Sequence, residues 1–357
     1  MISLVLTNRD RNLQIVEKSL KSLSVQSDKD FKVFLIDYGS KLDYIDNLKE
    51  LTKAYNFLEL VICPVQGQLW NKSRAINIAL KRTTSPFFLV GDIDLIFHSD
   101  FINIAKGLAN SKEIHYFQYG FLSKSEAAQD KDFNSYEVDF KGNEGVTGTT
   151  LFPKEFLMEI NGYDEFYHGW GAEDTDVHIR FKNSGFPVIF HNERILVKHQ
   201  WHPKAYRSNK SNNPFHSTLE KVNNSYMHFT SQSKRSKVNI HREWGMQPLD
   251  IDYRILMKNV SDHSFEVTCD DTSITAMLMQ FRNFENEIVE ILIKEISIKE
   301  KFKQFLKKIF RKKYKNYLDL QVINNKILEE VISFYPNHPY IYSFDREKNI
   351  IKFKIKF

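Results

Sequence analysis

The chain has 357 residues, of which 42% are hydrophobic and 14% aromatic, and its formal net charge at pH 7 is +5. This length exceeds what a single hydrophobic core ordinarily serves, so two domains are expected. Neither nucleic-acid binding nor a disulfide framework is favoured, because the positive charge is small and the two cysteines, Cys63 and Cys269, lie far apart. The cysteine usage fits a reducing cytoplasm, where we expect the protein. No apolar run has the length of a transmembrane helix.

The first part of the chain alternates between strand and helix patterns. Short apolar runs predict strands over 2–6, 31–36 and 57–62. Apolar residues at helical spacing lie between these runs, and a further helix is predicted over 70–82. Because such alternation with short connections gives right-handed crossovers, we expect a mostly parallel sheet with helices on both faces.

Three polar segments, 7–9, 37–40 and 92–94, follow strands of this predicted sheet. Since the carboxyl ends of parallel strands lie at one edge of a sheet, we expect these segments to converge there. Asp37 would then accept hydrogen bonds from a base or ribose, and Arg9, Lys72 and Arg74 would hold phosphates. Alternatively, Asp37 and Ser40 cap a turn and the three cations are solvated. A Rossmann or P-loop site is disfavoured, because neither glycine-rich motif is present.

Two carboxylates, Asp92 and Asp94, follow an apolar strand pattern over 87–90 that ends at Gly91. A buried strand does not carry two acids unless they are paired, hydrogen-bonded or bound to a metal, because burial removes their hydration. We therefore expect the strand to stop at Gly91 and to present both acids at its end. A turn or cap role is the alternative, because three-residue patterns recur by chance.

A second group of acids follows a Gly-Trp-Gly segment at 169–171. Glu173, Asp174 and Asp176 open a predicted helix, where the macrodipole stabilises acids, and Asp176 can pair with Arg180 one turn later. Capping explains some of these acids but not the glycines around the tryptophan. A carboxylate on a rigid element beside an indole platform is typical of a general base at a sugar site.

Two further strands are predicted at 187–191 and 194–199, and the second ends in His199, with His202 shortly after it. Beside the oxygen-rich Asp-X-Asp pair, one imidazole favours Mn2+ over Ca2+. Both histidines also have a purely structural interpretation, and the sequence does not decide which of the two would bind a metal.

The remainder of the chain is less regular. Residues 204–248 are polar and predict a long loop or flap with short helices. A hairpin is predicted around 345–349. Four segments alternate like strands, at 251–260, 264–271, 273–281 and 287–298.

Residues 298–315 predict a helix that carries nine cations. Its apolar face consists of Phe302, Phe305, Leu306, Ile309 and Phe310. Such a basic amphipathic helix can lie on an anionic membrane surface, near lipid-linked acceptors. In the alternative interpretation, the helix packs its phenylalanine stripe onto the second domain and leaves a solvated basic face.

Four motifs, TNRDRN at 7–12, DYGS at 37–40, GDIDLIF at 91–97 and GWGAEDTDVHIRF at 169–181, together resemble family 2-type glycosyltransferases of the GT-A fold. Among these glycosyltransferases, the chain most resembles the subgroup that shares the galactosyltransferase C-terminal motif, as in chondroitin polymerase and β-1,4-galactosyltransferases. The resemblance covers roughly residues 1–205. It implies an α/β, GT-A type nucleotide-diphospho-sugar transferase fold, to which the remaining sequence adds a smaller C-terminal α+β domain.

The resemblance also implies roles for individual residues. The second acid of Asp-X-Asp binds Mn2+ with the donor diphosphate in that family, which implies that Asp94 is a metal ligand and that Asp92 lies near the ribose and the metal. His199 is then the further metal ligand, Asp174 the catalytic base, and Glu173 an acceptor-binding residue.

Trp170 is expected to bind the acceptor as well. Ala172 stands where the family more often has glycine, and we expect the turn to tolerate it. The residues that we assign to donor binding are Thr7, Asn8, Arg9, Asp37, Ser40, Asn71, Lys72, Arg74, Asp92 and His202.

The expected protein is an inverting glycosyltransferase that depends on Mn2+ or Mg2+. It would move a hexose or N-acetylhexosamine from a UDP-sugar to a hydroxyl of a glycan or lipid-linked acceptor, in the synthesis of a surface polysaccharide such as a capsule. The alternatives are a non-catalytic carbohydrate-binding protein on the same fold and a nucleotidyltransferase on a similar sheet. The expected parts are a GT-A catalytic domain at 1–205, a flap or linker at 206–249 and an accessory domain at 250–357. Peripheral contact with the inner face of the cell membrane would use 298–315.

Overall fold

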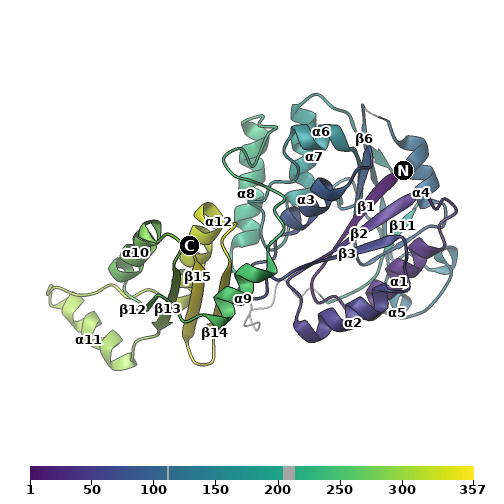
Figure 1. Cartoon of the computed structure of the whole chain (residues 1–357). Coiled ribbons are helices and arrows are strands. Elements are labelled where there is room, and N and C mark those ends of the chain that lie inside the picture. Colours follow the sequence, from purple (N-terminus) through teal and green to yellow (C-terminus); the bar gives the residue numbers. More distant parts are fainter. Residues whose placement is uncertain (111, 204–213) are drawn as a thin grey trace. The chain divides into compact units, whose positions relative to one another are not determined.

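The computed structural model describes residues 1–357 except 111 and 204–213 (Figure 1). The chain forms two compact units, and each is described by itself. The N-terminal unit contains Met1–Cys63, Asn71–Tyr206 and Glu220–Gln247, and the C-terminal unit contains Pro64–Trp70, Arg207–Leu219 and Pro248–Phe357. These bounds differ from the expected three parts, because most of the expected flap lies in the N-terminal unit.

A seven-stranded sheet forms the centre of the N-terminal unit, with the order β10-β6-β9-β4-β1-β2-β3. All neighbouring strands are parallel except β9, which runs antiparallel to β4 and to β6. The expectation of a mostly parallel α/β sheet is therefore confirmed. The strands are β1 (Ile2–Asn8), β2 (Phe31–Tyr38), β3 (Leu58–Cys63), β4 (Phe87–Asp92), β6 (Ile114–Phe117), β9 (Thr150–Pro153) and β10 (Val188–His191).

Helices cover both faces of this sheet. Figure 1 shows α1 and α2 on one side and α3, α6 and α7 on the other. Helix α1 illustrates the packing, because its apolar residues Val16, Leu20 and Leu23 lie at helical spacing and are fully buried. The helices of the unit are α1 (Leu13–Ser24), α2 (Leu42–Thr52), α3 (Lys72–Arg82), α4 (Phe101–Leu108), α5 (Lys124–Ala127), α6 (Lys154–Glu159), α7 (Glu173–Asn183) and α8 (Leu219–Gln232), with a 3-10 turn at Phe133–Ser135.

The predicted convergence of three polar segments is confirmed by the strand register. Thr7 on β1 lies opposite Asp92 on β4, and Asn8 lies opposite Asp37 on β2. Strand β1 lies inside the sheet and is buried along its whole length, which fits its mostly apolar sequence. Strand β4 continues one residue past Gly91, so Asp92 is its last residue.

A small second sheet in this unit has the order β5-β11-β7-β8. Its strands are β5 (Leu95–Phe97), β7 (Tyr119–Phe121), β8 (Phe140–Lys141) and β11 (Val197–His199). Strand β11 runs antiparallel to β5 and places His199 opposite Leu95. The backbone N–H of Gln200 also donates to the carbonyl of Asp94 at 2.9 Å. This pairing brings the histidines of the chain's 199–202 segment to the Asp-X-Asp turn.

The expected flap contains a 14-residue helix, α8, and is more regular than the sequence suggested. Its Asn223 is fully buried and its side-chain amide donates to the carbonyl of His168 at 2.9 Å. The first part of the expected flap, 204–213, lies outside the described residues. The prediction of a loop with short helices is therefore corrected for 219–232.

The C-terminal unit contains a four-stranded sheet in the order β12-β13-β15-β14. The predicted hairpin is confirmed, because β14 and β15 pair antiparallel around 346–349. The strands are β12 (His263–Thr268), β13 (Ile288–Lys294), β14 (Tyr340–Asp345) and β15 (Ile350–Lys356), and the helices are α9 (Asp250–Lys258), α10 (Asp271–Gln280), α11 (Ile298–Ile309) and α12 (Leu320–Phe334), with a 3-10 turn at Phe281–Asn283.

Two predicted strands of this unit, 251–260 and 273–281, are wrong, because they form helices α9 and α10. The buried residues of α9 are Tyr253 and Leu256, which are three positions apart and lie on one helical face. Helix α10 begins with an N-cap that the sequence reading overlooked, in which Asp270 accepts from the backbone N–H of Ser273 at 3.2 Å. Among the described residues, no helix combines the length and apolarity that crossing a bilayer requires.

Candidate active site

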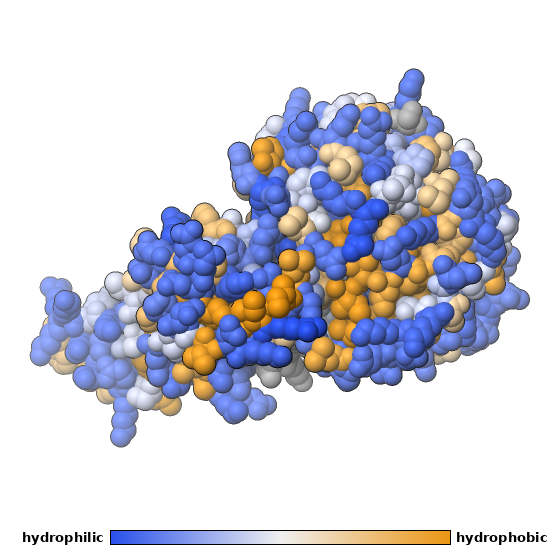
Figure 2. All heavy atoms as spheres, viewed as in Figure 1, coloured by the Kyte–Doolittle hydropathy of each residue, from blue (hydrophilic) through white to orange (hydrophobic). Residues whose placement is uncertain are grey.

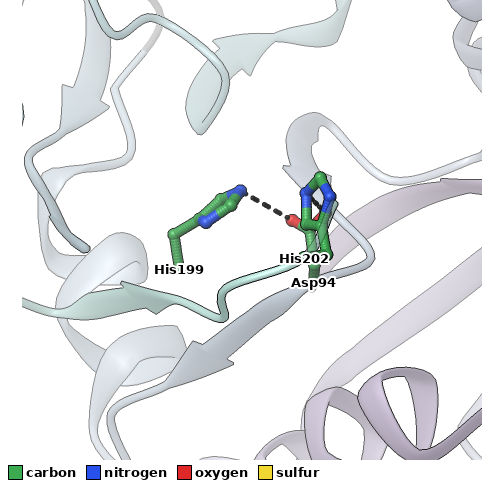
Figure 3. Close-up of side chains that lie close together, drawn as sticks. All are labelled: Asp94, His199 and His202. Carbon is green, nitrogen blue, oxygen red and sulfur yellow. Dashed lines mark ion pairs between the residues drawn. The ribbon is translucent and has the colours of Figure 1, made fainter. Parts of the chain in front are cut away.

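Asp94, His199 and His202 form a cluster at the end of the Asp-X-Asp turn (Figure 3). One ligand atom from each of the three side chains lies within 4.8 Å of the others. His199 Nε2 is 3.4 Å from Asp94 Oδ1, and His202 Nε2 is 3.1 Å from Asp94 Oδ2. Both imidazole rings converge on one carboxylate (Figure 3), so the structure brings together both histidines that the sequence left as alternatives.

The surroundings of Asp94 suit a cation. Asp94 is only 4% exposed, and Oδ1 accepts no hydrogen bond from a described residue. Burial alone would raise the pKa of this carboxyl, but His199, His202 and Arg11 together hold it well below its usual value. An ionised carboxylate with an unsatisfied oxygen beside two imidazoles is a donor set that fits a divalent metal and leaves coordination positions open.

Asp92 lies in a different environment, although it is two residues away. Its Oδ1 accepts from Lys72 Nζ at 2.9 Å and its Oδ2 from the Tyr119 hydroxyl at 2.9 Å. A side chain at Gly148 would collide with this group, because a Cβ there would lie 2.7 Å from Asp92 Oδ2 and 2.6 Å from the Tyr119 hydroxyl. The glycine therefore allows the backbone to approach the carboxylate closely.

Lys72 links the two groups of acids that the sequence showed separately. Its Nζ is 2.8 Å from Asp174 Oδ2 and 3.6 Å from Glu173 Oε1, in addition to its contact with Asp92. Burial opposes a charged ammonium, but these three carboxylates raise the pKa of Lys72 well above its usual value. Lys72 was assigned to donor binding; the structure places its ammonium among three carboxylates, and its role in donor binding stays a prediction.

Asp174 occupies the first turn of α7 and combines burial with an unsatisfied atom. Its Oδ2 accepts from Lys72, while Oδ1 is buried and has no hydrogen-bond partner among the described residues. Burial is the main cause that raises the pKa of Asp174 to about 7, and the nearby Glu173 and Asp92 add to it, while Lys72 opposes them. A carboxyl group that titrates near neutral pH is suited to general base catalysis.

The loop before α7 presents an indole to solvent. Trp170 is 48% exposed, and it lies between Gly169 and Gly171, which have φ angles of 74° and 91°. Asn223 on α8 fixes this loop by donating to the carbonyls of Trp170 and Gly171 at 3.3 and 3.2 Å. The loop is therefore held by its backbone, which leaves the indole of Trp170 at the surface.

Ala172 completes the same turn in a left-handed conformation, with φ 73° and ψ −18°, and is the N-cap residue of α7. The turn forms, as expected, but the position favours glycine, because an L-residue there costs about 1–2 kcal/mol. The sequence alone did not indicate this strain.

Asp37, Asn8 and Ser40 form a buried hydrogen-bonded group at the ends of β1 and β2. Asp37 accepts from Asn8 Nδ2 at 2.7 Å and from the Ser40 hydroxyl at 2.6 Å. The Ser40 backbone N–H also donates to Asp37 at 3.1 Å, which is the capped turn that the sequence left open. Burial raises the pKa of Asp37. Their role in donor binding stays a prediction, and the same is true of Thr7 and Arg9 at the end of β1.

Asn71 and Arg74 face the protein interior. Asn71 is the N-cap of α3, where its side chain accepts from the Arg74 backbone N–H at 2.8 Å and donates to the Glu165 carbonyl at 2.9 Å. Arg74 is 5% exposed, and its Nε donates to the carbonyl of Met246 at 3.0 Å. These contacts stabilise the start of α3, and the role of both residues in donor binding stays a prediction.

Sequence reasoning missed three residues of the site. Arg11 lies within the quoted TNRDRN motif, and its Nη2 is 3.2 Å from Asp94 Oδ2. Tyr119 and Gly148 contact or border Asp92, but they belong to a part of the chain without a recognisable motif. Only Arg11 could have been found, because its charge and its place after the first strand were both visible.

Comparisons with known proteins show which sequences and structures the chain is similar to. Residues 3–125 match the sequence model of glycosyl transferase family 2, and residues 129–200 match that of the N-terminal domain of galactosyltransferase. Chondroitin sulfate synthase 3 of Mus musculus is 27% identical over 183 residues, which are 48% of this chain and 20% of that protein. Beta-1,4-galactosyltransferase 4 of Homo sapiens is 27% identical over 124 residues, which are 34% of this chain and 31% of that protein.

The chain thus spans between 20% and 31% of the length of these two relatives. A crystal structure of GalNAc-T7 with UDP, GalNAc and Mn2+ aligns with a TM-score of 0.47 and 13% identity, covering 64% of this chain and 48% of that one. The two family matches confirm the resemblance to family 2-type glycosyltransferases and to galactosyltransferases. Together with the mixed sheet described above, they confirm the GT-A fold.

Proposed function

Because the chain resembles family 2-type glycosyltransferases, we propose that it transfers a hexose or N-acetylhexosamine from a UDP-sugar to a hydroxyl of a glycan or lipid-linked acceptor. The observation that carries this proposal is the connection through Lys72. Its ammonium contacts Asp174, the expected base, and also Asp92, the neighbour of the Asp94 cluster. This link between two acid groups that are distant in sequence supports one site that contains both the proposed metal ligand and the proposed base.

Asp94, His199 and His202 would hold the metal, which we propose to be Mn2+ or Mg2+. A bound divalent ion supplies Lewis acidity that neutralises the charge of a departing nucleoside diphosphate. The Oδ1 of Asp94 is buried and accepts no hydrogen bond from a described residue, which supports this assignment, because a buried acceptor without a hydrogen bond is otherwise unfavourable. His202 joins the proposed ligands because its Nε2 approaches Asp94 at 3.1 Å.

Asp174 would take the proton from the acceptor hydroxyl as the oxygen attacks the anomeric carbon, so the configuration of that carbon is inverted. Its Oδ2 is held by Lys72, and its Oδ1 is left to accept from the hydroxyl. Glu173 and the exposed Trp170 would bind the acceptor, because an indole face stacks well against the apolar face of a sugar. Lys72 stabilises the ionised form of the base.

We further propose that this activity serves the synthesis of a surface polysaccharide and takes place in the cytoplasm. The similarity to chondroitin sulfate synthase supports a polymeric glycan as the product. The two buried free cysteines, one in each unit, support a reducing compartment.

A screen of UDP-sugars with Mn2+ tests the proposal. The purified chain should release UDP from one donor or a few, and chelation of the metal should stop the release. With an acceptor, NMR of the product should show an anomeric configuration opposite to that of the donor. The exposed Trp170 would also suit a carbohydrate-binding protein without activity. Such a protein would bind glycans but release no UDP from any donor, and that result would refute the enzyme.

A further inference from the structure

Helix α11 presents its apolar residues to solvent. Ile298, Phe302, Phe305 and Ile309 are 84%, 59%, 57% and 57% exposed. They occupy positions i, i+4, i+7 and i+11, so they form one continuous stripe along the helix. Phe310, the residue that follows the helix, is 67% exposed and extends the apolar surface.

The opposite side of α11 attaches the helix to its own unit through polar groups. Gln304 is the one buried residue of the helix. Its Nε2 donates to Glu300 at 2.6 Å, and its Oε1 accepts from the backbone N–H of Lys315 at 3.0 Å. The structure therefore contradicts the alternative in which the phenylalanine stripe packs onto the second domain. Within the described residues, an apolar stripe is left without a partner.

The residues around this stripe are strongly basic. Nine cations and one acid, Glu300, lie between positions 298 and 315. Lys301 pairs with Glu295, Lys303 with Glu300 and Lys315 with Asp270. The other six cations form no ion pair with a described acid, and they are Lys299, Lys307, Lys308, Arg311, Lys312 and Lys313.

Helical periodicity places lysines on both borders of the stripe. Lys299 and Lys303 follow one border, and Lys301 and Lys308 follow the other. Figure 2 shows hydrophilic residues over the α11 end of the C-terminal unit, with apolar residues between them. An apolar centre with cationic borders fits the boundary between acyl chains and headgroups, where lysine side chains extend to the phosphates.

We propose that α11 and the basic segment up to residue 315 form a docking surface for an anionic lipid bilayer. The stripe inserts its side chains at the level of the headgroups, and the unpaired cations bind the negative surface. Charge decides against a second copy of this chain, because two such helices would bring like charges together. The surface would hold the protein at a membrane where lipid-linked molecules are found, whatever reaction the N-terminal unit performs.

Vesicle sedimentation of the full chain tests this proposal without any activity assay. The protein should sediment with vesicles of phosphatidylcholine and phosphatidylglycerol and bind them at least about tenfold more strongly than vesicles of phosphatidylcholine alone. Raising the salt concentration should weaken the binding to anionic vesicles. Equal binding to both vesicle types, or none to the anionic ones, would overturn the proposal.

Two variants separate the apolar and ionic contributions. Phe302→Ser with Phe305→Ser should weaken vesicle binding about tenfold or more, and so should Lys307→Glu with Lys308→Glu. Because all four side chains are at least partly exposed, the melting temperature should not change. The matched control is Val260→Ser, which removes a 91% exposed apolar side chain of the same unit outside the stripe and should bind like the native chain.

Light scattering without lipid tests whether the apolar stripe instead mediates self-association. The native chain and the Phe302→Ser, Phe305→Ser variant should have the same mass in solution. A dimer of the native chain that becomes a monomer in this variant would assign the stripe to self-association and would overturn the lipid proposal. The lipid proposal would also be overturned if both variants bound vesicles as strongly as the native chain.

Discussion

Replacement of Lys72 by methionine tests the electrostatic link between the two acid groups. The substitution keeps most of the aliphatic volume and removes the ammonium that lies 2.8 Å from Asp174 and 2.9 Å from Asp92. At this distance and an effective dielectric constant of about 20, one such contact amounts to roughly 6 kcal/mol before desolvation is subtracted. Loss of one partner of a buried ion pair has a net cost of about 3–5 kcal/mol.

The pH dependence of this variant has a definite sign. The pKa of Asp174 is already raised to about 7, so its neutral form is favoured in the folded state. The stability that this group contributes is present at low pH, and it is lost as pH rises through about 7. Without Lys72 the pKa should rise by about 1–3 further. The variant should therefore lose most stability relative to the native chain above neutral pH and least near about pH 5.

Urea unfolding at several pH values and a pH profile of sugar transfer measure both effects. In the native enzyme, activity should fall as the pH drops below about 7, because the base must be ionised. In Lys72→Met this fall in activity on the acidic side of the pH profile should move to higher pH. Lys53→Met is the control, since its ion pair with Glu50 is exposed and should contribute less than about 1 kcal/mol. A Lys72→Met variant that has native stability, and whose activity falls over the same pH range as that of the native chain, would refute the reasoning.

Three further predictions concern single positions. Asp174→Asn should lower transfer by about 100-fold or more while UDP binding, measured by calorimetry, stays close to native; near-native turnover would remove Asp174 from its role. His199→Ala and His202→Ala should each weaken Mn2+ binding about 10-fold or more in a metal titration, and an unchanged affinity in either variant would exclude that histidine as a ligand. Ala172→Gly should stabilise the fold by about 1 kcal/mol in urea unfolding, because it relieves a left-handed alanine, and a destabilised variant would contradict this.

The sequence predicted those parts of the site that depend on local pattern. The convergence of Thr7, Asp37 and Asp92 follows from strand order in a parallel sheet, which apolar runs and short connections determine. The choice between His199 and His202 could not be made, because it depends on how the three-residue strand β11 pairs with β5. That pairing joins segments about a hundred residues apart and leaves no local signal.

Lys72 and the helices of the C-terminal unit show a different limit of prediction from the sequence. The positive charge of Lys72 was visible, but its carboxylate partners come from β4 and α7, and only the tertiary structure brings them to it. Helices α9 and α10 were taken for strands because short apolar segments fit both periods. In α9 the spacing of Tyr253 and Leu256 favoured a helix, and Asp270 was a cap signal for α10.

The two cysteines provide each unit with a separate reporter of opening. Cys63 is the last residue of the first segment of the N-terminal unit, and Cys269 belongs to the C-terminal unit; both are fully enclosed. Burial raises the pKa of Cys63 to about 12, so a thiol reagent meets almost no thiolate until the surrounding strands separate. If one cysteine is replaced by alanine, the rate at which a reagent labels the other cysteine measures how often the unit that contains it opens. The unit without a cysteine then contributes no labelling.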